Sequence, residues 1–344
     1  MRAALFPSPG LCEIVERGVP SPAAGEILVQ VHACGVCGTD LHIYQGDFPA
    51  RFPLVAGHEF AGLVEEAGPG VVHLRAGDRV SVDPNISCGA CPPCQKGYPH
   101  LCRDLSAVGV TLDGGFATHC TVPARQAHQL PEDMPFAIAA MSEPVACCVH
   151  GIEQARLRPG DTVLIIGAGM IGLVMLQLAL LHGASAVLVS EPSPQKRQTA
   201  HALGATAVVN PDSDNLAQAV AQTLGGDRTG DPGADLVIEC VGTESTAQQA
   251  ISLAAEAGRV LFFGVSPEAA RVTLSPYQVY RKELTITGSF TNPFTQGRAL
   301  ALLHSGRLKV EELITHRLPL DQLPKALQLM AAHQATKILI QPQS

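Results

Sequence analysis

The chain has 344 residues, which is more than one hydrophobic core usually serves, so two domains are expected. Hydrophobic residues make up 46% of the chain and charged residues only 16%, a composition that excludes a disordered protein. The formal net charge of -8 and the lack of a long basic run argue against nucleic acid and anionic membranes as partners.

The N-terminal residues do not place a long apolar core behind a basic start, so no signal peptide is expected. The apolar runs are too short or too broken by glycine to span a bilayer, and the expected location is the cytoplasm. Eleven cysteines in such a chain indicate metal ligands or reactive thiols rather than a disulfide framework.

The first third of the chain contains β-rich pieces at 26–33, 61–66 and 78–82, separated by glycine and proline. After Glu143, strand-like runs alternate with helix-length stretches, which predicts a parallel sheet covered by helices on both faces. Strands are expected at 162–166, 186–190, 235–239 and 259–264, and helices at 170–182, 194–203, 215–224 and 245–257. A helix at 321–333 and a strand at 336–340 form a tail that can pack back on the first domain, and 225–233 is expected to be a surface loop.

Four cysteines lie close together in the pattern C-x2-C-x2-C-x7-C, at Cys88, Cys91, Cys94 and Cys102. Four thiolates satisfy tetrahedral zinc and leave no open position, so the spacing predicts a structural zinc site in a lobe with little apolar material. An iron–sulfur cluster is the alternative for the same ligands, and four cysteines within fifteen residues argue against chance thiols.

A second, looser set consists of Cys37, His58, Glu59 and Glu143. A thiolate, an imidazole and one or two carboxylates make a mixed sphere that can leave a position for water or substrate. Each of three residues also has an ordinary explanation. His58 can be a hydrogen-bonded loop histidine, Glu143 can start a helix at Glu-Pro, and Cys37 can form a redox pair with Cys34.

A predicted strand at 163–166 is followed by the pattern G-x-G-x-x-G and an apolar helix. Gly167 permits the tight turn, Gly169 allows the backbone to approach a pyrophosphate, and Gly172 allows close packing of helix on strand. Ile171 lies in the first turn of that helix, whose free N–H groups can face the phosphates.

Glu191 stands at the end of the next predicted strand. Its carboxylate can accept hydrogen bonds from the adenosine ribose and would repel a 2′-phosphate, which favours NAD over NADP. Lys196 and Arg197 follow closely and weaken that preference.

The whole chain resembles the zinc-containing medium-chain dehydrogenases, and within them the polyol (sorbitol, arabitol) and threonine dehydrogenases. The resemblance rests on CGTDLH at 37–42, GHEFAGLVEEAG at 57–68, the 88–102 cysteines, SEPVACCVH at 142–150 and GAGMIG at 167–172. It implies an α/β protein with a β-rich GroES-like catalytic domain at 1–146 and 288–344. A doubly wound Rossmann NAD-binding domain would occupy 147–287.

The resemblance also implies roles for individual residues. It makes Cys37, His58 and Glu143 ligands of a catalytic zinc, beside a second, structural zinc. Glu59 is implied as an acid next to the catalytic metal that ligates it in some members, and Thr39 and His42 as a proton relay. The cofactor residues implied are Glu191 and Lys196 at the adenosine ribose, with Phe263, Gly264 and Val265 beside the nicotinamide.

The expected activity is zinc-dependent oxidation of a secondary alcohol of a polyol, such as arabitol or sorbitol, to a ketose with NAD. L-threonine 3-dehydrogenase and a butanediol-type alcohol dehydrogenase are the alternatives. A binding protein without catalysis, or a zinc-free reductase of the superfamily, is disfavoured by the intact metal and relay residues. Ile43 replaces the tyrosine that follows the relay histidine in relatives of mammalian sorbitol dehydrogenase, so sorbitol itself is not singled out.

Cobalt or manganese could also occupy the open metal site. The expected partners are a small alcohol and further copies of the chain, in a homo-tetramer or homodimer formed partly by pairing cofactor-domain edge strands.

Overall fold

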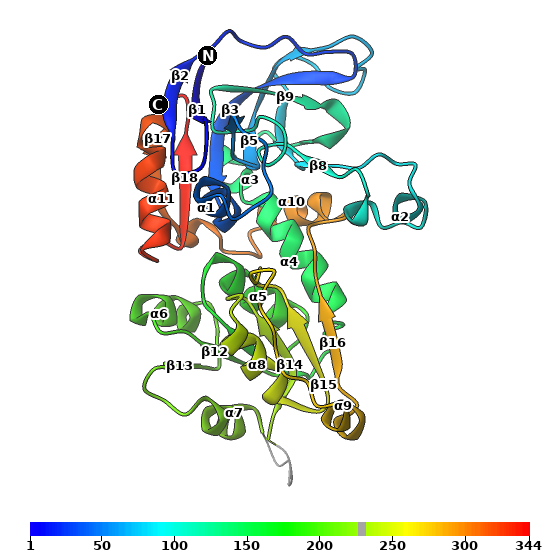
Figure 1. Ribbon diagram of the computed structural model, residues 1–344, viewed down its shortest axis with the longest axis vertical. Helices are drawn as coiled ribbons and strands as arrows, with labels where there is room; N and C mark the ends of the chain where they lie inside the picture. Colours follow the sequence, from blue (N-terminus) through cyan, green and yellow to red (C-terminus); the bar gives the residue numbers. More distant parts are fainter. Residues whose placement is uncertain (226–231) are drawn as a thin grey trace. The chain divides into compact units, whose positions relative to one another are not determined.

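The chain folds into two compact units in the computed structural model, which describes residues 1–225 and 232–344 (Figure 1). One unit comprises Met1–Ala146 and Asn292–Ser344, and the other comprises Cys147–Thr291. The sequence predicts the return to the first unit at residue 288, and the structure has it at Asn292. The difference arises because β16 (Thr285–Gly288) belongs to the second unit's sheet and the next residue still bonds to that sheet. Most of the loop predicted at 225–233 lies outside the described residues.

A seven-stranded sheet forms the centre of the first unit, in the order β10-β6-β5-β3-β18-β17, with β9 also paired to β3. Alternate side chains of β3, including Ile27, Val29 and Val31, are fully buried in the core of this unit. The tail returns as predicted, because β18 pairs antiparallel with β3. The strands of this sheet are β3 (Glu26–Val36), β5 (Glu59–Ala67), β6 (Arg79–Val82), β9 (His119–Pro123), β10 (Ala127–Gln129), β17 (Ile314–Pro319) and β18 (Lys337–Gln341).

Smaller elements surround that sheet. A three-stranded sheet has the order β2-β1-β4, and β7 pairs with β8 beside the four-cysteine segment. These strands are β1 (Arg2–Phe6), β2 (Glu13–Glu16), β4 (Leu54–Val55), β7 (Asn85–Ile86) and β8 (Ser106–Ala107). The helices are α1 (Gly38–Gln45), α2 (Pro92–Gln95), α3 (Phe136–Ala139), α4 (Ser142–Gln154), α10 (Gln296–His304) and α11 (Leu323–Ala331). The boundary between the two units falls within α4.

Six parallel strands form the sheet of the second unit, in the order β13-β12-β11-β14-β15-β16. This is the doubly wound order, which reverses between β11 and β14. The strands are β11 (Thr162–Ile166), β12 (Ala186–Ser190), β13 (Ala207–Val209), β14 (Ala234–Glu239), β15 (Ala254–Phe262) and β16. The helices that pack against them are α5 (Met170–Leu181), α6 (Pro194–Ala202), α7 (Leu216–Leu224), α8 (Glu244–Ser252) and α9 (Pro276–Lys282). None of the helices in the described ranges is long and apolar enough to cross a bilayer.

The sequence pattern misses parts of this sheet. The edge strands β13 and β16 are only 3 and 4 residues long, too short to show a periodicity. The helix predicted at 245–257 ends at Ser252, because Ala254 already pairs with Ala234 of β14. Its alanines favour a helix locally, and the neighbouring strand overrides that preference.

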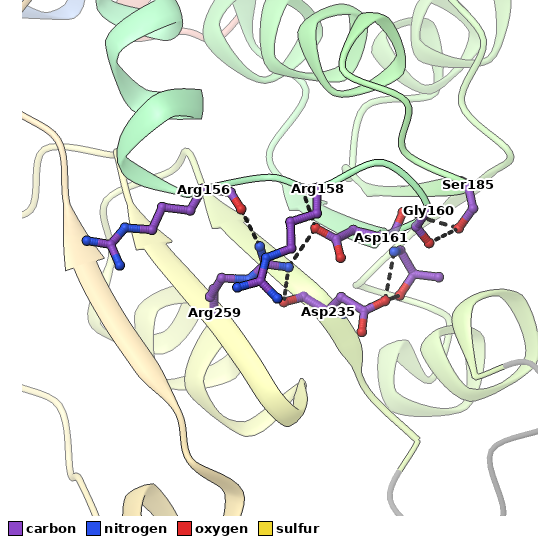
Figure 2. A network of polar contacts seen from close by, with 8 residues as sticks. Arg156, Arg158, Gly160, Asp161, Ser185, Asp235 and Arg259 are labelled. Carbon is purple, nitrogen blue, oxygen red and sulfur yellow. Dashed lines mark hydrogen bonds and ion pairs between the residues drawn. The ribbon is translucent and has the colours of Figure 1, made fainter.

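A network of polar groups around the buried Arg259 ties together the amino ends of the central strands in the second unit (Figure 2). The Arg259 guanidinium, at 10% side-chain exposure, bonds the Asp161 carboxylate at 2.7 Å and the Asp235 carbonyl at 3.3 Å. It also donates to the Arg156 carbonyl, while Asp161 accepts the Arg158 N–H at 2.6 Å. The charge on Asp161 is therefore satisfied by one cation and by the backbone.

Replacing Arg259 with Met should lower the free energy of unfolding by about 3 kcal/mol, because a buried carboxylate would lose its cation. Urea denaturation followed by circular dichroism measures the change. Arg281→Met is the matched control: its pair with Glu256 spans 3.2 Å, but the side chains are 64% and 58% exposed. That control should lose less than about 1 kcal/mol, and equal losses in the two variants would contradict the prediction.

Candidate functional site

Cys37 stands between β3 and α1, where the strand ends and the helix begins. Its backbone N–H donates to the Asp40 carboxylate at 2.8 Å, so an acid in the first turn holds the start of the helix. The Cys37 Sγ lies 3.8 Å from Thr39 Oγ1. Thr39 is half-buried, whereas His42, one turn along the same side of the helix, is exposed. The predicted relay pair therefore leads from the cysteine toward solvent.

His58 lies beside the same acid. Asp40 is fully buried, and its Oδ1 accepts the Gly57 N–H at 3.3 Å and lies 3.4 Å from His58 Nδ1. Gly57 has φ +92°, and a Cβ there would lie 2.8 Å from the Phe116 ring, so this turn requires glycine. A carboxylate on one imidazole nitrogen leaves the other available to a metal. Asp40 thus supports both Cys37 and His58.

Glu59 pairs with a lysine from the last strand of the chain. Lys337 Nζ bonds the Glu59 carboxylate and the Val36 carbonyl (3.2 Å), and the two charged residues are 4% and 1% exposed. The pair lies against Gly35, where a Cβ would overlap the Glu59 carboxylate and approach Lys337 Cε to 2.9 Å. The pair therefore depends on the missing side chain at position 35.

The structure brings three of the predicted ligands together. The ligand atoms of Cys37, His58 and Glu59 all lie within 4.8 Å of one another. Burial lowers the pKa of His58, but Asp40 and Cys37 outweigh it and raise that pKa well above its usual value. Burial also lowers the pKa of Lys337, and Glu59 and Cys37 raise it by more. The cluster thus favours positive charge, and its thiolate, imidazole and carboxylate donors fit a zinc ion.

Glu143 does not belong to this group of three among the residues that the structure describes. It is buried at 8% exposure in the first turn of α4, and its predicted role as a ligand stays a prediction. The start of that helix is anchored by Ser142, whose Oγ bonds Ser81 Oγ at 2.5 Å and Gln296 Nε2 at 2.8 Å.

This geometry argues against one alternative and adds two residues that the sequence did not single out. Cys34 is fully buried, and burial raises its pKa well above the usual value, which argues against a redox pair with Cys37. The sequence analysis missed Asp40 and Lys337. Asp40 could have been found as the third residue of a helix capped by Cys37, and Lys337 as a lone cation opening an apolar strand.

The four remaining predicted ligands form their own group. Cys88, Cys91, Cys94 and Cys102 place their Sγ atoms within 4.8 Å of one another. Cys102 is the only buried residue between 88 and 102, so no apolar core holds this lobe. Hydrogen bonds from the backbone N–H groups of Arg103 and Cys94 lower the pKa of Cys91 to about 6. A tetrahedral metal with four thiolates fits this group and supplies what the missing core does not.

The glycine loop of the second unit has the predicted form. It joins β11 to α5, with Gly167 at φ +96° and Gly169 as the helix N-cap. A Cβ on Gly172 would overlap the Gly167 carbonyl, which confirms close packing of helix on strand. Ile171 is half-buried in the first turn. The free N–H groups of α5 therefore begin at the carboxyl end of β11.

Glu191 contacts this loop directly. Its Oε2 accepts the Ala168 N–H at 2.7 Å, and its Oε1 accepts the Ser193 N–H at 2.9 Å. Arg197 donates to the carbonyls of Glu191 (2.7 Å) and Pro192 (2.6 Å), so a guanidinium is anchored beside the acid. Lys196 lies half-buried in the first turn of α6, and Val265 is 70% exposed after β15.

Gly35→Ala tests the close approach around Glu59. The added methyl would displace the Glu59–Lys337 pair, and loss of a buried pair costs about 3 kcal/mol of unfolding free energy. We expect the variant to lose the metal bound by Cys37 and His58 while keeping the metal of the four cysteines, as measured by mass spectrometry of the metal content. Gly38→Ala is the control, because a Cβ there meets nothing within 4 Å. Full metal content in Gly35→Ala would refute the prediction.

Comparison with known proteins agrees with this geometry. Residues 23–132 match the alcohol dehydrogenase GroES-like domain, and residues 171–304 match the zinc-binding dehydrogenase domain. The chain is 36% identical to D-arabinitol dehydrogenase 1 from Uromyces fabae, over 99% of this chain and 97% of that protein. It is 35% identical to L-threonine 3-dehydrogenase from Pyrococcus furiosus, over 95% of this chain and 94% of that protein.

Solved structures give the same result. A putative zinc-binding dehydrogenase from Sinorhizobium meliloti 1021, bound to NADP, is 41% identical with a TM-score of 0.94, over 99% of both chains. An alcohol dehydrogenase from Escherichia coli CFT073, complexed with NADH, is 34% identical with a TM-score of 0.91, over 99% of both chains. The chain therefore belongs to the zinc-containing medium-chain alcohol dehydrogenase family, in the branch of the polyol and threonine dehydrogenases, and is an oxidoreductase.

Proposed function

We propose that the protein oxidises a secondary alcohol of a polyol, a pentitol or hexitol, to a ketose with NAD as the hydride acceptor. The observation that carries this proposal is the buried cluster of Cys37, His58 and Glu59, which has one sulfur, one nitrogen and one oxygen donor in an anionic setting. The likeness to D-arabinitol dehydrogenase 1 supports a polyol as the substrate. The likeness to L-threonine 3-dehydrogenase makes threonine the second candidate.

The chain's own residues would divide the work as follows. Cys37 and His58 would hold the metal, with Glu59 or Glu143 completing its sphere. When bound there, zinc would lower the pKa of an alcohol hydroxyl as a Lewis acid, and NAD would accept the hydride. Thr39 would accept the substrate's hydroxyl proton while it passes its own hydroxyl proton on toward His42, because its Oγ1 lies beside the Cys37 Sγ. His42 is exposed on the same helix side and would release that proton to water.

Cys37→Ala tests the role of the cluster. We expect the wild-type protein to bind two zinc ions per chain and to produce NADH, followed at 340 nm, with a pentitol or hexitol. The variant should keep only the zinc of the four cysteines and lose about a thousandfold in kcat/KM, the effect of removing several kcal/mol of charge stabilisation. A metal-free variant with full hydride transfer would contradict the mechanism. Higher kcat/KM for threonine or butanediol than for every polyol would overturn the substrate proposal.

We propose NAD rather than NADP because the Glu191 carboxylate lies at the end of β12, where a 2′-phosphate would meet its negative charge. Arg197 is the feature that works the other way, since a guanidinium beside the acid can pair with a phosphate. The relatives differ on this point, one being bound to NADP and another to NADH.

Glu191→Ser should shift the cofactor preference. Removing the carboxylate while Arg197 remains should lower the ratio of kcat/KM for NAD to kcat/KM for NADP by about tenfold, equivalent to roughly 1.4 kcal/mol. Steady-state kinetics with both cofactors measure the ratio. Arg197→Ala is the companion variant and should raise it. A wild-type protein that prefers NADP would show that the Glu191 argument is wrong.

A further inference from the structure

Glu239 is a buried acid for which the proposed mechanism has no use. It is the last residue of β14, at 1% exposure, at the carboxyl end of the parallel sheet. Its Oε1 accepts the backbone N–H groups of Val241 at 2.7 Å and Gly242 at 2.8 Å. Its own carbonyl accepts the N–H groups of Phe263 and Gly264, each at 2.9 Å. One residue therefore holds both the loop after β14 and the loop after β15.

These two loops are closely packed against each other. A Cβ on Gly264 would overlap the Gly242 nitrogen and lie 2.8 Å from Glu239 Oε2. A Cβ on Gly242 would lie 2.5 Å from the Val265 carbonyl oxygen, and one on Gly167 would lie 2.7 Å from Val241 Cγ2. The glycine loop after β11 is thus in contact with the same assembly. The loops after β11, β14 and β15 form one packed group around the Glu239 carboxylate.

The position of these three loops at the carboxyl end of the sheet indicates that they form part of the dinucleotide site. In a doubly wound sheet, dinucleotides bind outside the carboxyl ends of the strands, where the strand order reverses, and here it reverses between β11 and β14. Loops at such a position are otherwise free to adopt several arrangements. A buried carboxylate that accepts two consecutive N–H groups selects one of them, because any other arrangement would leave its charge unsatisfied.

We propose that Glu239 is a positioning residue for the nicotinamide cofactor: its carboxylate preassembles the loop at 240–242, against which the loop at 263–265 packs, without touching the cofactor itself. This inference rests on the proposed function, in which the second unit binds a nicotinamide dinucleotide. Without the carboxylate, only a fraction of the molecules would hold the 240–242 loop, and with it the packing of Gly242 against Gly264 and Val265, in the binding arrangement. The apparent Kd for the cofactor rises in inverse proportion to that fraction.

The test is a direct titration of NADH and NADPH, followed by nucleotide fluorescence, on wild-type protein and on Glu239→Ala. We expect the alanine variant to raise the Kd of the preferred cofactor by about tenfold or more, as when a tenth of the molecules remain competent. Glu239→Gln keeps an acceptor oxygen of the same reach and should stay within about threefold of wild type. If the alanine variant does not fold, Glu239→Asp replaces it, because the shorter carboxylate cannot reach both N–H groups and should show the same loss.

Asp235→Asn is the matched control, at the amino end of the same strand. Asp235 Oδ2 accepts the Thr162 N–H at 2.9 Å and the Thr162 hydroxyl at 2.7 Å, so this variant also weakens a buried contact of β14. It should lower the melting temperature but leave the cofactor Kd within about twofold. Zinc content should be unchanged in all variants.

The outcomes separate the two ideas. Wild-type protein that binds neither nucleotide would overturn the proposed function and this inference with it. Wild-type protein that binds one of them, with an unchanged Kd in Glu239→Ala or Glu239→Asp, would overturn the inference alone. An equal loss of cofactor affinity in Asp235→Asn would also overturn it, because the effect of the Glu239 variants would then come from a general loss of fold stability. A loss confined to the Glu239 variants supports the positioning role.

Discussion

The candidate metal cluster of Cys37, His58 and Glu59 depends on one contact, the buried ion pair between Glu59 and Lys337. Glu59 begins β5 and Lys337 begins β18, and these two strands flank β3, which leads to Cys37. Two opposite charges at almost no exposure require each other, because either alone would be left uncompensated in the core. The last strand of the chain thereby sets the position of an acid beside Cys37 and His58. Gly35 makes the arrangement possible by leaving the space that the pair occupies.

A second type of interaction, between a buried carboxylate and backbone N–H groups, occurs in both units. Buried carboxylates accept pairs of backbone N–H groups and hold loops in place: Asp40 with Cys37 and Gly57, Glu191 with Ala168 and Ser193, and Glu239 with Val241 and Gly242. Such bonds are charge-assisted and specific in direction. Cys37, His58 and Gly167, which have predicted roles, lie in the connections that these acids hold. These acids give the loops a rigidity that the loops' own sequence does not supply.

The residues that identify the family do not identify the substrate, and the reason is physical. Metal ligands, the glycine loop and the four-cysteine lobe all have strict requirements of residue type and spacing, and all are present. Polyols, threonine and simple secondary alcohols share the carbinol group that this chemistry needs. They differ in the atoms around it, so the choice among them belongs to side chains outside the metal cluster.

The sequence by itself determined the β-rich first part, the alternating second part, the glycine loop and the four-cysteine site, because each is a local pattern of spacing or periodicity. It also offered Cys37, His58, Glu59 and Glu143 as a candidate metal set, but only the family resemblance gave them roles, since they come from separate segments. Tertiary structure decided which residues from distant parts of the chain come into contact. It added Asp40 and Lys337 to the cluster, and it ended α8 at Ser252 because β14 draws the next residues into the sheet. Burial and strand pairing act between residues far apart in sequence, so no local pattern reveals them.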